Sequence, residues 1–244
     1  GLYKDDAISS VEHRANLVLL LKYGMDFIKN YTMSGWVKMP NYRLNLPDYS
    51  DRAIFEGLVN HLIHRDYTVM GGEVHIDIYD DRVELVSPGA MLDGTQIQDR
   101  DIYKVPSMRR NPVIADVFTQ LDYMEKRGSG LRKMRELTEK LPNFLQGKEP
   151  QYQTEATSFY TTFYNLNWNE SGRIPVEDVA NRVNSTLEKS PVSEASSVEK
   201  FGVNSKSSEK TFGDMQESSE KGSEIMQKGS EKKFGDSKNK SKSI

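Results

Sequence analysis

The 244-residue sequence contains no cysteine and no long run of apolar residues. Without cysteine, the chain forms no disulfide, holds no thiolate-bound metal and has no cysteine nucleophile. Its longest apolar run covers residues 17–21, far short of the roughly 20 residues that span a bilayer. No cleavable signal pattern opens the chain. These absences predict a cytoplasmic protein that contacts no membrane.

Motifs of three other protein classes are also missing. No Gly-x-x-x-x-Gly-Lys-Ser/Thr phosphate loop is present, since residues 147–149 read Gly-Lys-Glu, and this excludes a translocating motor helicase. Residues 64–66 read His-Arg-Asp, as in a kinase catalytic loop, but Gly71 stands where that loop has its metal-binding Asn. Four histidines without cysteine or a His-x-x-x-His pair do not predict a zinc site.

Composition divides the chain into a core-forming part and a tail. Residues up to 170 are rich in Leu, Ile, Val, Phe and Tyr, whereas Ser, Lys, Glu and Gly dominate residues 171–244, where Ser-Glu-Lys recurs every eleven residues. So few apolar groups do not offset the entropy of ordering a chain. We therefore expect an N-terminal helix and extended linker over 1–49, a domain core over 50–170 and a disordered tail over 171–244.

The charges are nearly balanced, with 33 basic and 36 acidic residues, so the chain is not a domain that holds nucleic acid by net charge. Local basic patches remain candidates at Arg109 and Arg110 and along residues 126–135. We expect the two arginines to be solvated charges at a helix start. We also expect Trp36 and Trp168 to be packing residues rather than base-stacking platforms.

Hydrophobic periodicity predicts an α+β fold with one mostly antiparallel sheet covered by helices. The expected hairpin spans residues 73–89 about an Asp-Asp turn, and residues 88–112 are irregular. Helices are expected over residues 11–30, 51–65, 112–121 and 131–141, an extended edge over 33–50 and a late strand over 158–168. Ser50 is the expected N-cap of the second helix.

The second helix places Glu56, Asn60 and His64 on one narrow polar stripe. Residues four apart on a helix differ in direction by only about 40°, because each residue turns the chain by about 100°. A carboxylate can accept a proton from water, and a carboxamide oxygen one turn away can ligate a hard cation such as Mg²⁺. The stripe therefore suits metal-assisted phosphate chemistry.

The stripe and three further blocks resemble a known family. Glu-x-x-x-Asn on a helix, a hairpin ending at a glycine and a later Gly-x-Gly opening a helix are similar to the N-box and glycine boxes of the gyrase, histidine-kinase and MutL (GHKL) ATPases. In order along residues 15–166, EGLVNHLIHRDY, YDDRVELVSPG, RRNPVIADVF and YMEKRGSGLRKM resemble the RecG-like, Schlafen-AlbA-associated C-terminal ATPase domain of bacterial transcriptional regulators.

This resemblance implies a Bergerat fold, a two-layer α/β sandwich with a mixed, mostly antiparallel sheet that binds ATP and Mg²⁺. Glu56 would be the general base, and Asn60 would bind Mg²⁺. His64 and Gly89 would belong to the ATP site, and the amides of Gly128, Ser129 and Gly130 would contact phosphate at a helix start. GHKL proteins usually carry an adenine-binding Asp in the first glycine box, where this chain has Val-Ser-Pro-Gly at 86–89, and Asp93 would replace it only if its loop folds back.

Three functions therefore remain open at this point. The first is an ATP-binding module of a transcriptional regulator, with or without Mg-dependent hydrolysis, in which DNA is bound by domains absent from this chain. The second is a degenerate, non-catalytic scaffold for dimerisation or interaction, such as a homodimer, favoured by the missing adenine Asp. The third is direct nucleic-acid binding through the basic residues of 126–135.

Overall fold

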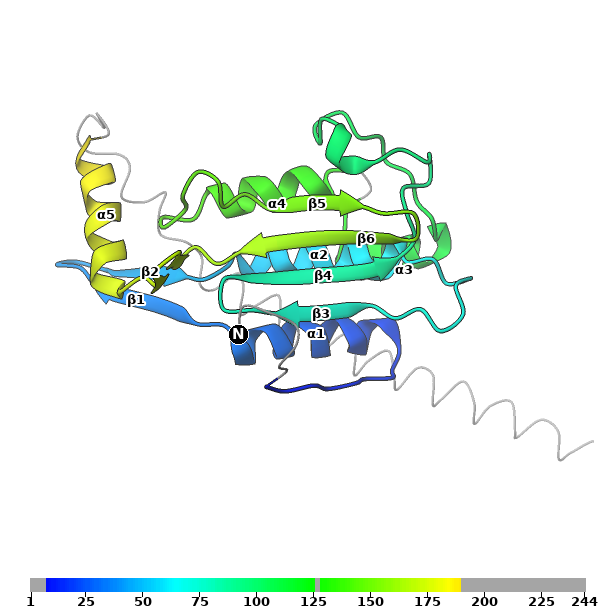
Figure 1. The fold of residues 1–244 in the computed structure, drawn as a ribbon, viewed down its shortest axis with the longest axis horizontal. Coiled ribbons are helices and arrows are strands. Elements are labelled where there is room, and N and C mark those ends of the chain that lie inside the picture. The colour runs from blue at the N-terminus through cyan, green and yellow to red at the C-terminus, as the bar shows by residue number, and fades with distance from the viewer. Residues whose placement is uncertain (1–7, 126–127, 190–244) are drawn as a thin grey trace, which may run out of the picture. The chain divides into compact units, whose positions relative to one another are not determined.

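An antiparallel four-stranded sheet is the framework of the computed structural model, which describes residues 8–125 and 128–189 (Figure 1). Its strands are β3 (His75–Ile78), β4 (Arg82–Pro88), β5 (Gln151–Thr154) and β6 (Ser158–Tyr164), in the order β3-β4-β6-β5. Each of the three pairings is antiparallel, so the predicted α+β class is confirmed, but the described sheet is not mixed.

The sheet has one apolar face and one polar face because side chains alternate along each strand. Val83, Leu85 and Phe163 point to the apolar face and are almost fully buried. On the opposite face, Glu84 pairs with Thr162, and both remain partly exposed. The predicted hairpin about the Asp-Asp turn is thus confirmed, and its apolar face is the one that the helices cover.

Three helices cover the apolar face of the sheet (Figure 1). They are α1 (Leu17–Tyr31), α2 (Asp51–His64) and α4 (Gly130–Glu139), and α2 contacts both of the others as well as β4 and β6. The Ser50 hydroxyl accepts from the Ala53 amide at 3.3 Å, which confirms the predicted N-cap. Gly57 lets α2 approach the sheet closely, since a Cβ there would lie 3.0 Å from side chains of Leu85 and Phe163.

A long connection runs from β4 to helix α3 (Pro112–Gln120) and contains one turn of 3-10 helix, Ile97–Asp99, as the irregular pattern predicted. It is fastened to the edge strand β5. The Ile97 amide donates to the Thr154 hydroxyl at 2.9 Å, and the Thr154 amide donates to the Gln98 side chain at 2.9 Å. These hydrogen bonds fix the position of the connection beside Thr154, at the end of β5.

The expected boundaries at both ends of the core were wrong. Residues within 1–49 form a hairpin of β1 (Ser34–Lys38) and β2 (Arg43–Pro47) instead of a linker. The segment expected as tail contains β8 (Gly172–Arg173), which pairs with β7 (Trp168–Asn169), and helix α5 (Val176–Lys189). The eleven-residue repeats lie outside the described residues.

Helix α5 forms because its apolar residues recur at helical spacing although its average composition is polar. Val179, Ala180 and Val183 are buried together with Leu46 of β2. Four partly buried side chains complete this cluster: Val37, Leu44, Ile174 and Val176. One face of the β1–β2 hairpin is thus covered by α5.

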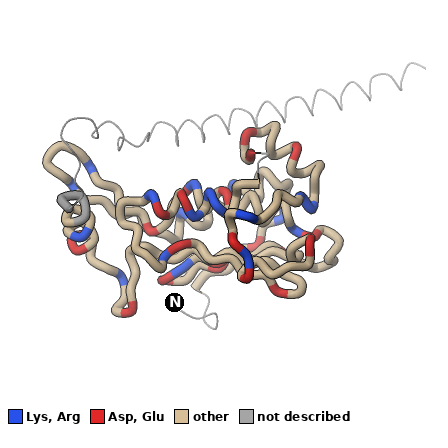
Figure 2. Tube along the Cα trace, turned by 90° about the horizontal axis from the view of Figure 1, so that it is seen from above, with Lys and Arg blue, Asp and Glu red and all other residues tan. Residues whose placement is uncertain are grey.

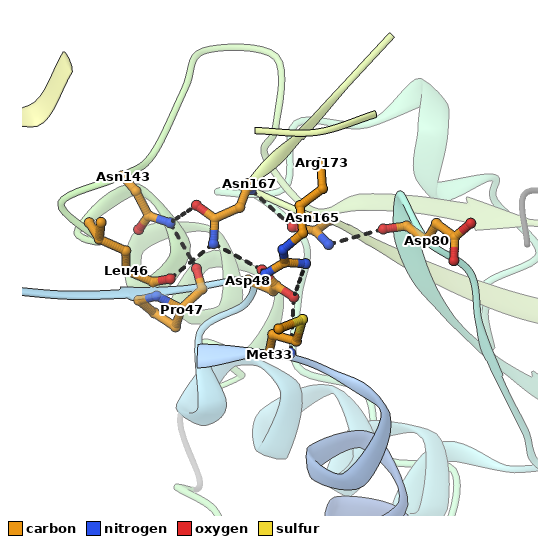
Figure 3. A network of polar contacts seen from close by, with 9 residues as sticks. All are labelled: Met33, Leu46, Pro47, Asp48, Asp80, Asn143, Asn165, Asn167 and Arg173. Atoms are coloured by element: carbon orange, nitrogen blue, oxygen red, sulfur yellow. Dashed lines mark hydrogen bonds and ion pairs between the residues drawn. The ribbon is translucent and has the colours of Figure 1, made fainter. Parts of the chain in front are cut away.

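A buried polar network joins the start of α2 to the segments on either side of it (Figure 3). Asp48 accepts from the Met33 amide at 3.0 Å, from Asn167 at 2.9 Å and from Arg173 at 2.8 Å. Asn143 donates to the Pro47 carbonyl and to the Asn167 side chain, both at 2.8 Å. The network ties the hairpin, the β7–β8 turn and the segment after α4 to one buried carboxylate.

None of the helices in residues 8–125 and 128–189 combines the length and the apolar character that crossing a bilayer requires.

Candidate functional site

The polar stripe of α2 meets the first residues of α4. Glu56, Asn60 and His64 lie on one side of α2, and Gly130 packs directly against the first two. A Cβ at Gly130 would lie 2.5 Å from Asn60 Nδ2 and 3.2 Å from Glu56 Oε1. Glycine at position 130 permits this approach without a shift of Asn60, and it brings the polar stripe and the Gly-x-Gly turn together.

A cavity of about 140 Å³ lies beside this contact. Asn60 and His64 of α2, Gly89 after β4, and Gly128 and Gly130 before α4 all contribute to its wall. These residues are separated by up to 70 positions in the sequence, yet they surround one space. The cavity is smaller than the ~300–1,000 Å³ of typical ligand pockets, so a large ligand requires the surrounding loops to move apart.

The loop between β4 and α3 supplies an apolar wall to the cavity. The wall residues from this loop are Met91, Leu92, Ile102, Val105 and Met108, and Phe159 of β6 joins them. Gly128 adopts φ +63°, and a Cβ there would lie 2.4 Å from Cβ of Ser107, so the loop and the glycine turn are in close contact. An apolar wall opposite a polar one is typical of a site for a ligand with a flat ring and a charged group.

Arg110 is the cation at the cavity wall, and a partly buried ion pair holds it in place. Its guanidinium lies 3.2 Å from Asp66, and it also donates to the Ala90 carbonyl. The Asp66 amide in turn donates to the Pro88 carbonyl at 2.8 Å. The expectation of a solvated charge was wrong for Arg110, because it bridges the end of α2 and the loop after β4.

Asn111 fastens α3 to the end of α2. Its side-chain amide donates to the carbonyls of Ile63 at 2.7 Å and Arg65 at 2.8 Å. These carbonyls lie at the C-terminus of α2, where backbone acceptors lack partners within the helix. The Asn-Pro pair thus starts α3 as predicted and, in addition, fixes the position of Arg110.

Glu56 is buried, and one of its oxygens has no hydrogen-bond partner among the described residues. Burial raises the pKa of this carboxyl above its ordinary value, while Lys133 and Arg52 oppose the shift. Glu56 is not among the residues that line the cavity, since Gly130 lies over it. Only 5% of the Glu56 surface is exposed, so little of its carboxylate is open to water.

Two histidines of α2 are kept neutral by their surroundings. Burial, helped by the charges of Arg110 and Arg109, lowers the pKa of His64. Burial lowers the pKa of His61 to about 3, and its Nε2 lies 3.0 Å from the Thr161 hydroxyl in the core. His61 is therefore a core residue, and His64 presents a neutral imidazole to the cavity.

The remaining two candidates, Ser129 and Asp93, and two of their neighbours in the motifs, Ser87 and Arg65, each have a different position. Ser129 stands at the N-cap of α4 beside the cavity but does not line it. Asp93 binds Arg100 at 2.5 Å within its own loop and does not line the cavity, so it does not replace the missing adenine carboxylate. Ser87 occupies the wall where that carboxylate is expected. Arg65 donates to the Gly72 carbonyl and has no ion pair with Asp66, which binds Arg110 instead.

Arg110 and the apolar loop were the site residues that the sequence reasoning did not assign. The block RRNPVIADVF contained the signal for Arg110. This arginine directly precedes the Asn-Pro pair that starts a helix, so the helix start fixes the orientation of its backbone. The apolar residues between 91 and 108 lack any period, and only the folded loop brings them to one wall.

Chemically, the wall offers a carboxamide, a neutral imidazole, a guanidinium and the backbone of a glycine turn at a helix start. No group of three or more His, Cys, Asp or Glu side chains in the described part of the chain is arranged to hold a metal ion. Mg²⁺ does not require such a group, because it is usually held by one or two protein ligands together with phosphate oxygens and water.

The fold is an α/β sandwich, and part of it matches a known family. The model of the family HATPase_c_4, described as "Putative ATP-dependent DNA helicase recG C-terminal", matches residues 71–163. This segment contains β3, β4, the apolar loop, α3, α4, β5 and nearly all of β6. The resemblance drawn from the sequence motifs is therefore confirmed over residues 71–163, which hold three of its four blocks, while the block at 56–67 precedes the match.

The fold is also similar to a solved structure, the DIP2311 protein from Corynebacterium diphtheriae. The TM-score is 0.51 at 22% identity, over 68% of this chain and 31% of that one. The matched region thus spans about a third of that protein, and the likeness concerns the fold alone. No curated protein matches the chain.

Proposed function

We propose that the cavity between α2, the β4–α3 loop and the glycine turn binds ATP together with Mg²⁺. The observation that carries the proposal is the gathering of Asn60, His64, Gly89, Gly128 and Gly130 around one space. The family match over residues 71–163 supports a nucleotide as the ligand. In this account, the chain is a nucleotide-binding module of a transcriptional regulator, in which other domains bind DNA and two copies pair.

The polar wall suits the phosphates. The amides at the start of α4 point out of a helix N-terminus, which favours anions, and Arg110 adds an oriented guanidinium donor whose charge Asp66 partly balances. The Asn60 oxygen suits Mg²⁺, which neutralises phosphate charge when bound. Asp66 keeps the Arg110 side chain oriented before any ligand arrives.

The apolar loop suits the base. Met91, Ile102 and Phe159 offer flexible and flat apolar surface, and Ser87 offers a hydroxyl in place of the carboxylate of other ATPases of this type. A single hydroxyl distinguishes one base from another less sharply than a carboxylate. We therefore propose that selectivity for adenine over guanine is below about tenfold, the loss of one hydrogen bond.

Hydrolysis requires one further movement. Glu56, the proposed base, lies under Gly130, and its raised pKa makes it a stronger proton acceptor once water reaches it. This burial favours a second candidate, a module that binds nucleotide or a partner protein without turnover. Opening of the glycine turn distinguishes an ATPase from such a scaffold.

Calorimetry on the full chain tests the proposal. Titration with ATP and Mg²⁺ is expected to release or absorb heat, and Asn60→Ala is expected to weaken the magnesium-dependent part of binding by about tenfold, equivalent to 1.4 kcal/mol. Asn181→Ala, at an exposed asparagine of α5, is the matched control and leaves binding unchanged. Glu56→Ala retains binding and abolishes any phosphate release.

Two results would contradict the proposal. Absence of both heat and thermal stabilisation at millimolar ATP favours the scaffold. Equal phosphate release by the wild type and Glu56→Ala would show that Glu56 is not the base. The calorimetric heats would still decide whether ATP binds.

A further inference from the structure

The β1–β2 hairpin presents a face that no described element covers. Helix α5 packs on the side that carries Val37, Leu44 and Leu46. The alternate residues Trp36, Lys38, Arg43 and Asn45 point to the opposite side, and all four are exposed. We call these four residues the outer face. The register places Trp36 opposite Asn45 and Lys38 opposite Arg43, so they form two adjacent cross-strand pairs.

Trp36 departs from the packing role that the sequence suggested, because 51% of its surface is exposed. The Arg43 guanidinium lies over the indole ring at 4.7 Å from its centroid. Arg43 is held there by Asn45, whose side-chain oxygen accepts from Arg43 Nε at 2.9 Å. An aromatic ring and a guanidinium plane are thus stacked and oriented before any partner binds.

The charge of the hairpin has one sign. Residues 27–47 contain no Asp or Glu, although acidic residues outnumber basic ones in the whole chain. No carboxylate in the described part of the chain pairs with Lys38 or Arg43. Tyr42, in the connection between the strands, is a second exposed aromatic side chain.

Helix α4 shows the contrast, since its cations are neutralised. Arg132 lies 3.3 Å from Glu136, Arg135 lies 2.8 Å from Glu139, and Lys133 lies 2.6 Å from Glu125. Over the folded unit, acidic and basic positions are interspersed in the same way (Figure 2). The described part of the expected basic patch therefore offers little free charge to a polyanion, and its Lys126 and Arg127 lie outside the described residues.

We propose that the outer face binds single-stranded nucleic acid. Bases stack on aromatic rings and on arginine planes, and cations beside the ring contact the backbone phosphates. Trp36 and Arg43 supply the stacking surface, and Lys38 and Arg43 supply the charge. A single strand fits better than a duplex because only unpaired bases expose their faces to a ring. This surface is separate from the nucleotide cavity and does not depend on ATP.

Fluorescence anisotropy of a labelled 12-nucleotide single strand measures the interaction with the full chain. If this face contacts two phosphates, a plot of log affinity against log salt concentration is expected to have a slope of about −1.4 from these contacts. Lys38→Ala/Arg43→Ala is expected to remove this contribution and to weaken binding at least tenfold at ~0.1 M salt. Trp36→Ala is expected to weaken it by about tenfold, with little change in the salt slope.

Two controls distinguish binding at the outer face from non-specific binding by positive charge elsewhere on the protein. Arg132→Ala/Arg135→Ala removes the same charge from α4 and is expected to change affinity less than twofold. In a Trp168→Phe background, Trp36 is the only tryptophan, and the strand is expected to quench its fluorescence under selective tryptophan excitation. Thermal melting of every variant shows that the hairpin still folds.

Four outcomes would overturn the proposal. They are no anisotropy change at ~100 μM protein, equal losses from the hairpin and α4 variants, tighter binding to a duplex than to a single strand, and vesicles of anionic lipid displacing the strand. The last outcome would assign the exposed ring and cations to a membrane surface.

Discussion

Two carboxylates eight residues apart, Asp48 and Glu56, are both buried, yet their surroundings differ. Both oxygens of Asp48 accept hydrogen bonds, from a backbone amide, an asparagine and an arginine. Glu56 has an oxygen without a partner among the described residues and lies under a glycine turn. A satisfied buried carboxylate stabilises a fold, whereas an unsatisfied one raises the free energy of the folded state. Asp48 is therefore a structural residue, whereas the unsatisfied oxygen of Glu56 supports the proposal that this carboxylate has a functional role.

The largest expected effect is at Asp48, the carboxylate whose hydrogen bonds are satisfied. Asp48→Ala leaves Arg173 and Asn167 without their acceptor and is expected to lower the free energy of unfolding by about 3 kcal/mol, since Arg173 is partly exposed. Urea denaturation measures it. Asp51→Ala, at an exposed carboxylate, is the control and changes stability by less than about 0.5 kcal/mol. If Asp48→Ala lowered ATP affinity as strongly as stability, the Asp48 network would not be separate from the nucleotide cavity.

The next effect concerns the glycine turn. Gly128→Ala forces an unfavourable positive φ and a contact with Ser107, and is expected to lower stability by about 2 kcal/mol and to abolish nucleotide binding. Gly94→Ala has a similar φ of +71° with nothing within 4 Å, so it is expected to lose only about 1 kcal/mol and to keep binding. Equal nucleotide affinities of the two variants would separate the turn from the cavity.

A smaller effect depends on pH. The pKa of His61 is about 3 in the folded protein and about 6.5 when unfolded, so the unfolded chain binds the proton first as pH falls. The free energy of unfolding is therefore expected to fall by up to about 1.4 kcal/mol per pH unit between pH 6 and 4.5. His61→Gln should reduce this slope, whereas His75→Gln, at an exposed histidine, should not. Identical slopes in urea denaturation would show that folding does not lower the pKa of His61.

The smallest effect is a gain in stability. The raised pKa of Glu56 means that the folded protein binds its proton more tightly, so its destabilisation is greatest above that pKa and disappears at low pH. Glu56→Gln is expected to raise the free energy of unfolding by about 1 kcal/mol at pH 8 and to leave it unchanged near pH 4. Glu177→Gln, on the exposed side of α5, serves as the control. Destabilisation at pH 8 would mean that Glu56 is a structural residue like Asp48.

Local patterns predicted the elements whose period is unbroken. Ser50 capped α2, the Asp-Asp turn closed the β3–β4 hairpin, and Asn60 met Gly130 as the order of motifs required. Helix α5 was missed because its five apolar residues were averaged with a polar segment. The hairpin β1–β2 was missed because Pro40 and Pro47 suggested an extended edge, and only α5 covers its apolar side.

The site was less predictable than the fold. Arg110 reaches the cavity through tertiary contacts with Asp66 and Asn111, and no spacing in the sequence records them. The burial of Glu56 under Gly130 likewise depends on how closely α4 approaches α2. The order of the motifs indicates which residues lie close together. The distance between α2 and α4 decides which of these residues are accessible to water.

Photolabelling tests the central claim most directly. The full chain would be irradiated with 8-azido-ATP and Mg²⁺, and the labelled peptides identified by mass spectrometry. The account predicts label within residues 87–110, on the apolar wall, that excess ATP suppresses and Gly128→Ala abolishes. Label confined to other segments, or insensitive to ATP and to Gly128→Ala, would contradict a nucleotide site between α2 and the glycine turn.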